Sequence, residues 1–214
     1  MGDTDQIVSR LLDAAGTTFA SEAGITLRNE PMPLFQLLVL AMLASKPIGA
    51  DVAAAAAHEL FDAGLRIPDS VLDADRQDVI DAFGRAGYAR YDESSATRLT
   101  ETATAVKDEY RGDLRRLASD CGEDAGEMRR ALHRFKGIGD TGSDIFLREV
   151  QDVWTWVRPY FDERAVNTAK KLGLPTNPDQ LRELAPRKTA HLAAALVRAS
   201  LDSDLLDQVI DEKE

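Results

Sequence analysis

The sequence predicts an all-helical fold. Leu, Ala and Val recur at spacings of three and four residues along most of the 214-residue chain, and alternating β-branched segments are absent. Gly and Pro fall between these periodic segments, where they are typical of turns. A chain of this length can bury a substantial core, either in one large domain or in two small ones.

The periodic segments of the first half define the first expected helices. The segment 5–21 predicts a helix, and the strongly apolar segment 34–44 predicts one that is buried on most sides. The Ala-rich segment 50–62 predicts a helix that neighbouring backbones can approach closely, because its side chains are small. Further helices are expected to begin at residue 68 and to cover 75–83 and 94–110.

The second half continues in the same pattern as far as an acidic tail. A short helix or a turn is expected over 113–118, and helices are expected over 124–135, 141–150, 152–160, 162–173, 178–184 and 187–201. Trp154 and Trp156 are expected to pack in the core or at an interface between helices, and the alternative is that they stack on a base. On a helix, two residues at this spacing cannot face the same way. The tail from residue 202 is expected to fray.

Composition and charge restrict the class of protein. The longest apolar run, 33–44, is shorter than the about 20 residues that span a bilayer. No basic segment precedes an apolar run at the N-terminus, so no signal peptide is predicted and a cytoplasmic location is expected. The single cysteine, Cys121, excludes an internal disulfide, an iron–sulfur cluster and a Cys-rich zinc site, and no metal is expected. The net charge of −11 argues against nucleic-acid binding unless cations gather on one surface.

The most informative segment is a glycine-containing turn at 136–140 between two predicted helices. Glycines permit backbone torsions that a Cβ would obstruct. They also let a phosphate approach the N–H groups at the start of the next helix, where an anion is favoured. The carbonyls of such a turn can hold a monovalent cation that bridges to phosphate. All these contacts are independent of base sequence. The candidate DNA contacts here are Lys136, Gly137, Ile138, Gly139, Thr141 and Gly142, and the alternative for Lys136 is a solvated side chain.

The segment 132–146 resembles the helix-hairpin-helix of the endonuclease III family of base-excision DNA glycosylases, and the resemblance covers about 34–174. The segment 33–46 is similar to the family's buried helix that ends at the DNA, and 87–91 is similar to the loop that the family pushes into the duplex. The resemblance implies two helical lobes with a central DNA-binding cleft. A six-helix bundle over 33–150 would end in the hairpin, and 1–32 together with 151–214 would form the second lobe. Further implied DNA contacts are Lys46, Tyr88, Arg90, Tyr91 and Arg164. The alternative for the two tyrosines is packing at a helix junction.

Asp162 is the candidate catalytic residue that the resemblance implies. The family has a catalytic aspartate about twenty residues after the hairpin, and the segment 161–174 fits that register without a gap. The negative charge of Asp162 would stabilise the positive charge that develops on the sugar as the glycosidic bond breaks. The alternative is that Asp162 is the N-cap of the helix that follows it, and the two roles are compatible.

Two departures from the family pattern restrict the expected chemistry. The lysine that forms a Schiff base in bifunctional members is replaced by Thr141, so no lyase activity is expected. The four-cysteine cluster near the C-terminus is also missing. The expected function is therefore that of a monofunctional DNA glycosylase that acts as a monomer, without cofactor, on duplex DNA with a damaged or mismatched base. In a prokaryote it would be nucleoid-associated. The alternatives are a non-catalytic relative that binds DNA or a repair partner, and a helical protein without a DNA function.

The cations of this acidic chain fall into groups along the sequence. If these groups share one face, they form a basic cleft on an acidic body; the alternative is that they are ordinary solvated helix faces. The groups are Arg129, Arg130, Arg134 and Lys136 before the turn, Arg158, Arg164, Lys170 and Lys171 around Asp162, and Lys46, Arg85 and Arg90 on the segments that resemble DNA-facing loops.

Overall fold

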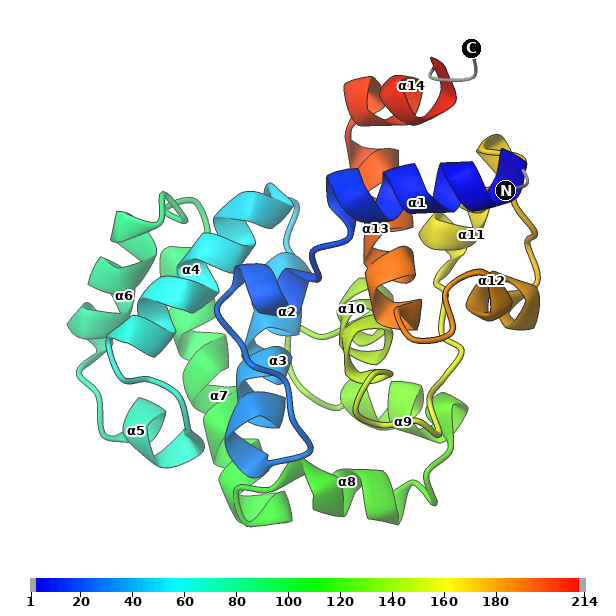
Figure 1. Cartoon of the computed structure of the whole chain (residues 1–214). Coiled ribbons are helices and arrows are strands. Elements are labelled where there is room, and N and C mark those ends of the chain that lie inside the picture. Colours follow the sequence, from blue (N-terminus) through cyan, green and yellow to red (C-terminus); the bar gives the residue numbers. More distant parts are fainter. Residues whose placement is uncertain (1–2, 212–214) are drawn as a thin grey trace.

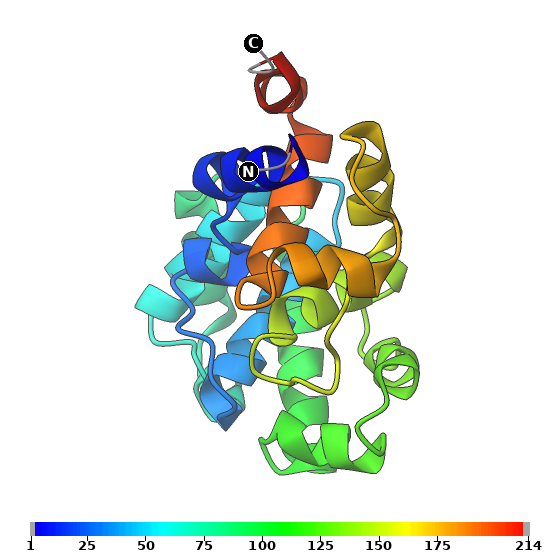
Figure 2. The same ribbon diagram turned by 45° about the vertical axis from the view of Figure 1, so that its right-hand side comes forward.

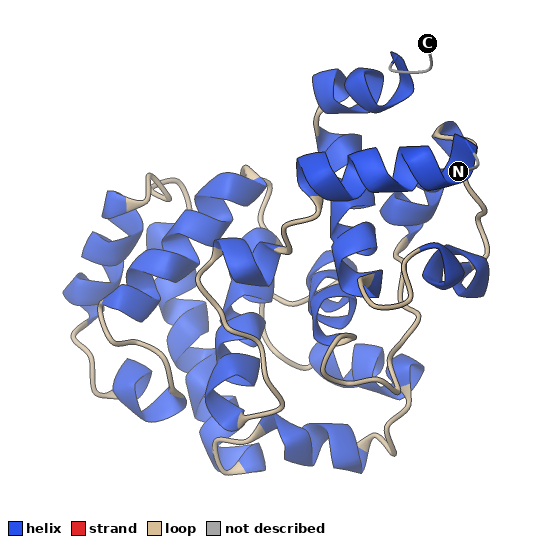
Figure 3. Cartoon of the chain, viewed as in Figure 1, coloured by secondary structure: helices blue, strands red, loops and turns tan. Residues whose placement is uncertain are grey.

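The computed structural model describes residues 3–211 and shows an all-α protein, which confirms the predicted fold class (Figures 1 and 3). These residues contain no strand, and none of their helices has the length and hydropathy needed to cross a membrane. The first half contains α1 (Asp3–Ala15), α2 (Phe19–Glu22), α3 (Pro31–Ala44), α4 (Ala50–Asp62), α5 (Pro68–Leu72), α6 (Arg76–Arg85) and α7 (Asp92–Tyr110). The second half contains α8 (Leu114–Asp120), α9 (Ala125–Leu132), α10 (Asp140–Val150), α11 (Glu163–Lys171), α12 (Pro178–Leu184), α13 (Thr189–Leu201) and α14 (Ser203–Asp211).

Side-chain caps explain why many of these helices begin where they do. An oxygen at the N-cap accepts a hydrogen bond from a backbone N–H of the first turn, which otherwise has no partner within the helix. The residues that cap a helix in this way are Thr18, Asp113, Asp124, Asp162 and Asn177. The starts of these helices are therefore fixed locally by the sequence.

Two expectations about the termini are wrong. The single helix expected over 5–21 is divided into α1 and α2, because Thr18 is extended and its side chain accepts a hydrogen bond from Ser21 N–H, which starts a new helix. The tail expected to fray from residue 202 forms α14 instead. This helix packs against α1 and α13 and buries Val209.

The prediction of a helix over 152–160 is also wrong, because this segment forms successive turns. The buried Gln151 side-chain amide donates to the Tyr160 carbonyl and accepts from the Tyr160 N–H, both at 2.9 Å. Trp154 donates from its indole to Asn29, at 2.9 Å. Without a helix, the two-residue spacing does not separate the tryptophans: Trp154 is buried as predicted, and it stacks on Trp156 with 5.3 Å between the ring centroids.

Packing divides the helices into two sets joined by α10. In the first set α3 is buried on most sides, as predicted, and it packs against α4, α7 and α8. In the second set α13 packs against α1, α11 and α14, so that the C-terminal helices lie beside the N-terminal one (Figures 1 and 2). Helix α10 contacts both α3 and α13. It is therefore held by both sets.

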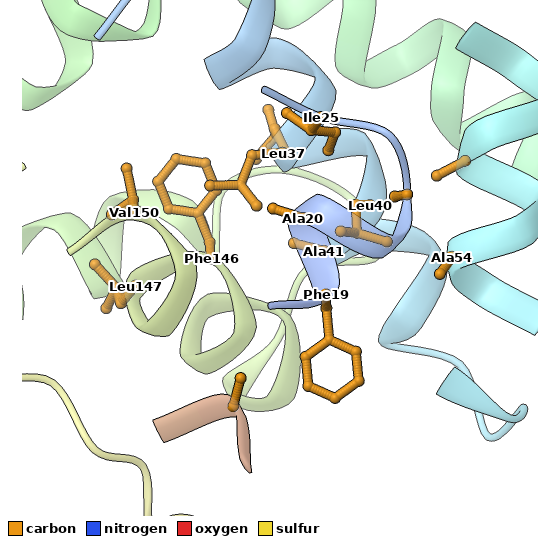
Figure 4. Packing of buried hydrophobic residues seen from close by; sticks show 14 of the residues in the cluster. Phe19, Ala20, Ile25, Leu37, Leu40, Ala41, Ala54, Phe146, Leu147 and Val150 are labelled. Atoms are coloured by element: carbon orange, nitrogen blue, oxygen red, sulfur yellow. The ribbon is translucent and has the colours of Figure 1, made fainter. Parts of the chain in front are cut away.

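The core at this junction fixes the position of α10 relative to α3 (Figure 4). Buried side chains from α2, α3, α4 and α10 converge there, among them Phe19, Leu37, Leu40, Ala54, Phe146 and Leu147. At the first turn of α10, Gly142 lies so close to the end of α3 that an added Cβ would be 2.3 Å from Ser45 Oγ and 3.3 Å from the Ala41 carbonyl. The absence of a side chain at residue 142 thus places the start of α10 against the end of α3.

Candidate functional site

The turn between α9 and α10 leaves the first backbone N–H groups of α10 without a partner in the helix. Gly137 has φ of 92°, the left-handed region that glycine adopts readily, and Gly139 is the N-cap of α10. No side chain caps this helix, and its first intrahelical bond is donated by Ser143 to the Gly139 carbonyl. The N–H groups of the three residues between them, Asp140, Thr141 and Gly142, therefore have no acceptor within the helix. Such groups favour an anion.

Only part of the predicted turn is accessible. Gly139 and Thr141 are exposed, whereas the Ile138 side chain is buried in the core and Gly142 is buried against α3. Any DNA contact of Ile138 or Gly142 is thus restricted to the backbone. Lys136 is exposed, and its ammonium group donates to Glu101 at 2.7 Å.

Three of the other predicted contacts gather beside this turn. Lys46 follows Ser45, the residue against which Gly142 packs. Its ammonium nitrogen lies 5.8 Å from the centroid of the Tyr91 ring, and the Arg90 guanidinium lies 5.4 Å from the same centroid. The structure thus brings Lys46, Arg90 and Tyr91 together at the end of α3, next to the start of α10. We call this cluster, with residues 136–142, the hairpin face.

The Tyr88 side chain is fully buried, which fits its alternative role of packing at a helix junction and leaves it unavailable for a DNA contact in this structure. Its hydroxyl donates to the Leu43 carbonyl at 3.1 Å and lies 3.3 Å from Ser95 Oγ, and its ring packs against Phe83. Burial raises the pKa of Tyr88 above its ordinary value. Tyr88 therefore attaches the loop 87–91 to the core, whereas Tyr91 is half-buried at the surface.

The predicted cation groups are only partly free of carboxylates. Arg129 pairs with Asp140 at 2.9 Å and Asp144 at 3.2 Å. Arg85, Arg130, Lys136 and Arg158 also have acidic partners, and Arg134 donates to the Tyr110 hydroxyl. By contrast, no carboxylate within residues 3–211 pairs with Lys46, Arg90, Arg164, Lys170 or Lys171.

Asp162 is the N-cap of α11, as its alternative role predicted. Its Oδ1 accepts from the Ala165 N–H at 2.9 Å, and its Oδ2 accepts from Arg148 Nη1 at 2.5 Å. The two side chains of this ion pair are 6% and 4% exposed. Both oxygens of Asp162 therefore have partners, and an arginine away from water neutralises the charge of the carboxylate.

Sequence reasoning missed Arg148 and Glu149, which complete a buried ionic cluster with Asp162. Glu149 is fully buried, its Oε2 accepts from the Ala20 N–H at 2.8 Å, and its Oε1 lies 3.5 Å from Arg148 Nε. The Arg148 guanidinium also lies 5.2 Å from the centroid of the Phe19 ring. The cluster thus connects α10 with α2 and with the start of α11. The only signal in the sequence is that large apolar residues flank both charges.

Asp162 and Thr141, which the resemblance places at one reaction centre, share no hydrogen bond within residues 3–211. Arg148, the partner of Asp162, lies seven residues after Thr141 on α10, two helical turns or roughly 10 Å along the axis. Thr141 is exposed, whereas Asp162 is buried. Two surface cavities lie elsewhere. One is lined by Met32, Ile67 and Lys107 among others, and the second by the segments around Gly64 and Asp81. Neither Thr141 nor Asp162 lines either of these cavities.

The fully buried Glu149 gives an expected pH dependence of stability. Burial raises the pKa of Glu149 above its ordinary value of 4.5, and this effect outweighs the lowering by Arg148 and by the Ala20 N–H. Because the pKa of Glu149 is higher in the folded state than in the unfolded state, the protonated side chain favours folding. This contribution of Glu149 to the free energy of unfolding is complete below pH 4.5 and is lost as the pH rises through the folded-state pKa. Relative to the Glu149→Gln variant, the wild type should therefore lose stability as the pH rises from about 4.5 towards neutrality.

Urea unfolding of both proteins at a series of pH values measures this difference in the free energy of unfolding. If the difference in the free energy of unfolding between the two proteins stays constant over the whole pH range, burial does not raise the pKa of Glu149. The exposed pair of Arg130 and Glu127 supplies a matched control, because Glu127→Gln removes a carboxylate whose side chain is 55% exposed. The Glu127→Gln variant should follow the wild-type profile.

No group of three His, Cys, Asp or Glu side chains in the described part of the chain is arranged to hold a metal ion. Comparison of the chain with protein-family models, with curated proteins and with solved structures finds no match. Function is therefore inferred from the geometry of the hairpin face and from the resemblance of its motif.

Proposed function

We propose that the protein binds duplex DNA through the hairpin face, as a non-catalytic relative of the endonuclease III-like proteins of base-excision repair. One observation carries the proposal: the uncapped first turn of α10 lies against the end of α3, beside two cations, Lys46 and Arg90, that have no carboxylate partner within residues 3–211. Unpaired N–H groups and unneutralised cations together fit a phosphate backbone.

The acidic net charge of the chain restricts where DNA can bind. At a net charge of −11 the protein as a whole repels DNA. Attraction is then restricted to a face where cations are not cancelled by neighbouring acids. Asp140, which starts α10 and is exposed, opposes phosphate binding, and its pairing with Arg129 reduces this effect. Binding that depends on so few cations should be weak, and it should decrease as the salt concentration rises.

The proposal includes the organisation that the resemblance implies. The two sets of helices joined by α10 would be the two lobes, over 33–150 and over 1–32 with 151–214, with the duplex at their junction on the hairpin face. Helix α2, assigned to the second lobe, contacts α4 of the first. A monomer in the cytoplasm, associated with the nucleoid in a prokaryote, accords with such a role.

The surroundings of Asp162 favour a non-catalytic role. A carboxylate promotes cleavage of a glycosidic bond by stabilising positive charge on the sugar, and for this it needs access and a net negative charge. Asp162 is buried, one of its oxygens caps α11 and the other pairs with Arg148. Arg148 cancels the charge that the reaction would use.

The second candidate function is a monofunctional DNA glycosylase that hydrolyses the bond with Asp162 and a water. Its support is the place of Asp162 at the start of α11, which follows the hairpin in the register that the resemblance requires. The enzyme would have to separate Asp162 from Arg148 when DNA binds. Thr141 stands exposed at the position of the family's lysine, and a hydroxyl cannot form a Schiff base.

A titration of a labelled duplex over a range of salt concentrations tests the proposed binding. The logarithm of the association constant should fall linearly with the logarithm of the salt concentration, by about 0.9 for each phosphate contact. Two duplexes of unrelated sequence should bind about equally, since backbone contacts carry no sequence information. Wild-type protein that does not bind duplex DNA at low salt would refute the proposal.

An excision assay separates the two candidate functions. Duplexes that contain uracil, an oxidised pyrimidine, an alkylated purine or an A:G mismatch are incubated with the wild type and with Asp162→Asn, and alkali then reveals abasic sites. We expect no abasic sites with any duplex. Excision by the wild type that is lost in a folded Asp162→Asn variant would instead establish the glycosylase. Borohydride should trap no covalent adduct in either case.

A further inference from the structure

Arg98, which lies on α7 outside the hairpin motif, touches the glycine turn directly. A Cβ added at Gly137 would be 2.8 Å from Arg98 Cδ, 3.4 Å from Nε and 3.6 Å from Nη1. Part of the guanidinium group itself, and not only the aliphatic stem, therefore rests against the backbone of the turn. Gly137 is thus required both by its positive φ and by the approach of this arginine.

The charge of Arg98 is not neutralised, and the reason lies one turn further along α7. Residues three apart on a helix are neighbours, so Glu101 is the nearest candidate partner for Arg98 on α7. Glu101 is instead engaged by Lys136, at 2.7 Å. No carboxylate within residues 3–211 pairs with Arg98. Lys136, which the sequence marks as a DNA contact, thus occupies the acid and leaves Arg98 as the free cation at the turn.

We propose that Arg98 is a phosphate-binding residue of the hairpin face, an inference that rests on the proposed binding of duplex DNA. A guanidinium presents several N–H donors in one plane and binds a phosphate through two of them. Arg98 is half-buried and held against the turn, so little side-chain freedom is lost when it binds. A phosphate at the first turn of α10 would then be contacted by backbone N–H groups and by this guanidinium.

The variant that isolates this role is Arg98→Met, because methionine keeps an unbranched stem against Gly137 and removes the charge. The affinity for duplex should fall about eightfold at a salt concentration of about 0.1 M, and the slope of the salt dependence should decrease by about one. Arg98→Lys should retain the slope and lose part of the affinity, because an ammonium does not bind a phosphate through two donors.

Lys107→Met is the matched control. It removes one positive charge from the same helix at a position that pairs with Asp69, at 2.7 Å, away from the turn. Its affinity and salt slope should stay at the wild-type values. Urea unfolding of all variants shows whether the turn has kept its stability.

Three outcomes would overturn the inference. If Arg98→Met binds as the wild type does, with the same slope, Arg98 contacts no phosphate and the proposed function stands without it. If its affinity falls with an unchanged slope and a lower urea midpoint, Arg98 only supports the structure of the turn. If the wild type does not bind duplex DNA at all, the proposed function and this inference fail together.

Discussion

Replacing Arg148 by methionine should destabilise the protein by about 3–5 kcal/mol, the cost of removing one partner from a buried ion pair. Arg148 lies between Asp162 and Glu149, at 2.5 Å and 3.5 Å, and the side chains of all three are almost completely buried. Its removal leaves Asp162 without a counter-charge and takes the nearest cation from Glu149, and both carboxylates lie away from water. Methionine has a similar length, so loss of charge dominates over loss of packing.

Urea unfolding of the Arg148→Met variant measures the loss in the free energy of unfolding. Arg130→Met is the control, because Arg130 pairs with Glu127 at the surface and such pairs contribute at most about 1 kcal/mol. If the two variants lose equal stability, the cluster around Arg148 does not hold α10 and α11 together as described.

A triple variant separates charge from shape. Combining Arg148→Met with Asp162→Asn and Glu149→Gln removes every charge of the cluster, and Asn still caps α11. Replacing a whole buried ion cluster by hydrophobic residues of similar volume is often nearly neutral for stability, and the two amides and the methionine likewise leave no buried charge without a partner. Most of the loss caused by Arg148→Met should therefore be recovered, and a triple variant as unstable as the single one would contradict this explanation.

Reversing the two unpaired cations at the end of α3 should have the largest effect on DNA binding. The variant Lys46→Glu with Arg90→Glu removes two phosphate contacts, each of which contributes about eightfold at about 0.1 M salt, so affinity should fall by at least about 60-fold. The two acids introduced add repulsion beyond this figure. The salt slope should fall by about two.

The control for this double variant is Lys107→Glu with Arg111→Glu. It makes the same change in net charge at the opposite end of α7, roughly 25 Å from Tyr91 along the helix. Its affinity should fall much less than that of the variant in the hairpin face. Equal losses in the two double variants would show that net charge controls binding, and not the hairpin face.

Several helix starts were predictable because they depend on local chemistry, although the local cap at Thr18 was overlooked. Asp124 and Asn177 cap helices through bonds to N–H groups two or three residues away, and such signals lie within a short stretch of sequence. The segment 152–160 was not predictable, because its conformation depends on partners from elsewhere. Trp154 bonds to Asn29, 125 residues earlier, and Gln151 supplies the bonds that a helix would otherwise have given Tyr160.

The same distinction applies to the site. The glycines of the turn were evident from a local motif, and Lys46, Arg90 and Tyr91 were expected from the resemblance of the segments 33–46 and 87–91 to the family. Which tyrosine of that loop is buried depends on the Leu43 carbonyl of α3, which accepts from Tyr88 and is distant in sequence. Arg148 was missed for a similar reason, since one arginine near a helix end is usually solvated.

The most direct measurement of duplex binding by the hairpin face is a comparison of backbone amide resonances with and without a short duplex, at low salt and at about 1 M salt. At low salt, the largest shifts should occur at Gly139 to Gly142, at Lys46 and at Arg90, and they should disappear at high salt. Residues of α14 should not change. Shifts confined to α11 or α14, or a spectrum that the duplex leaves unchanged, would contradict the proposed interface.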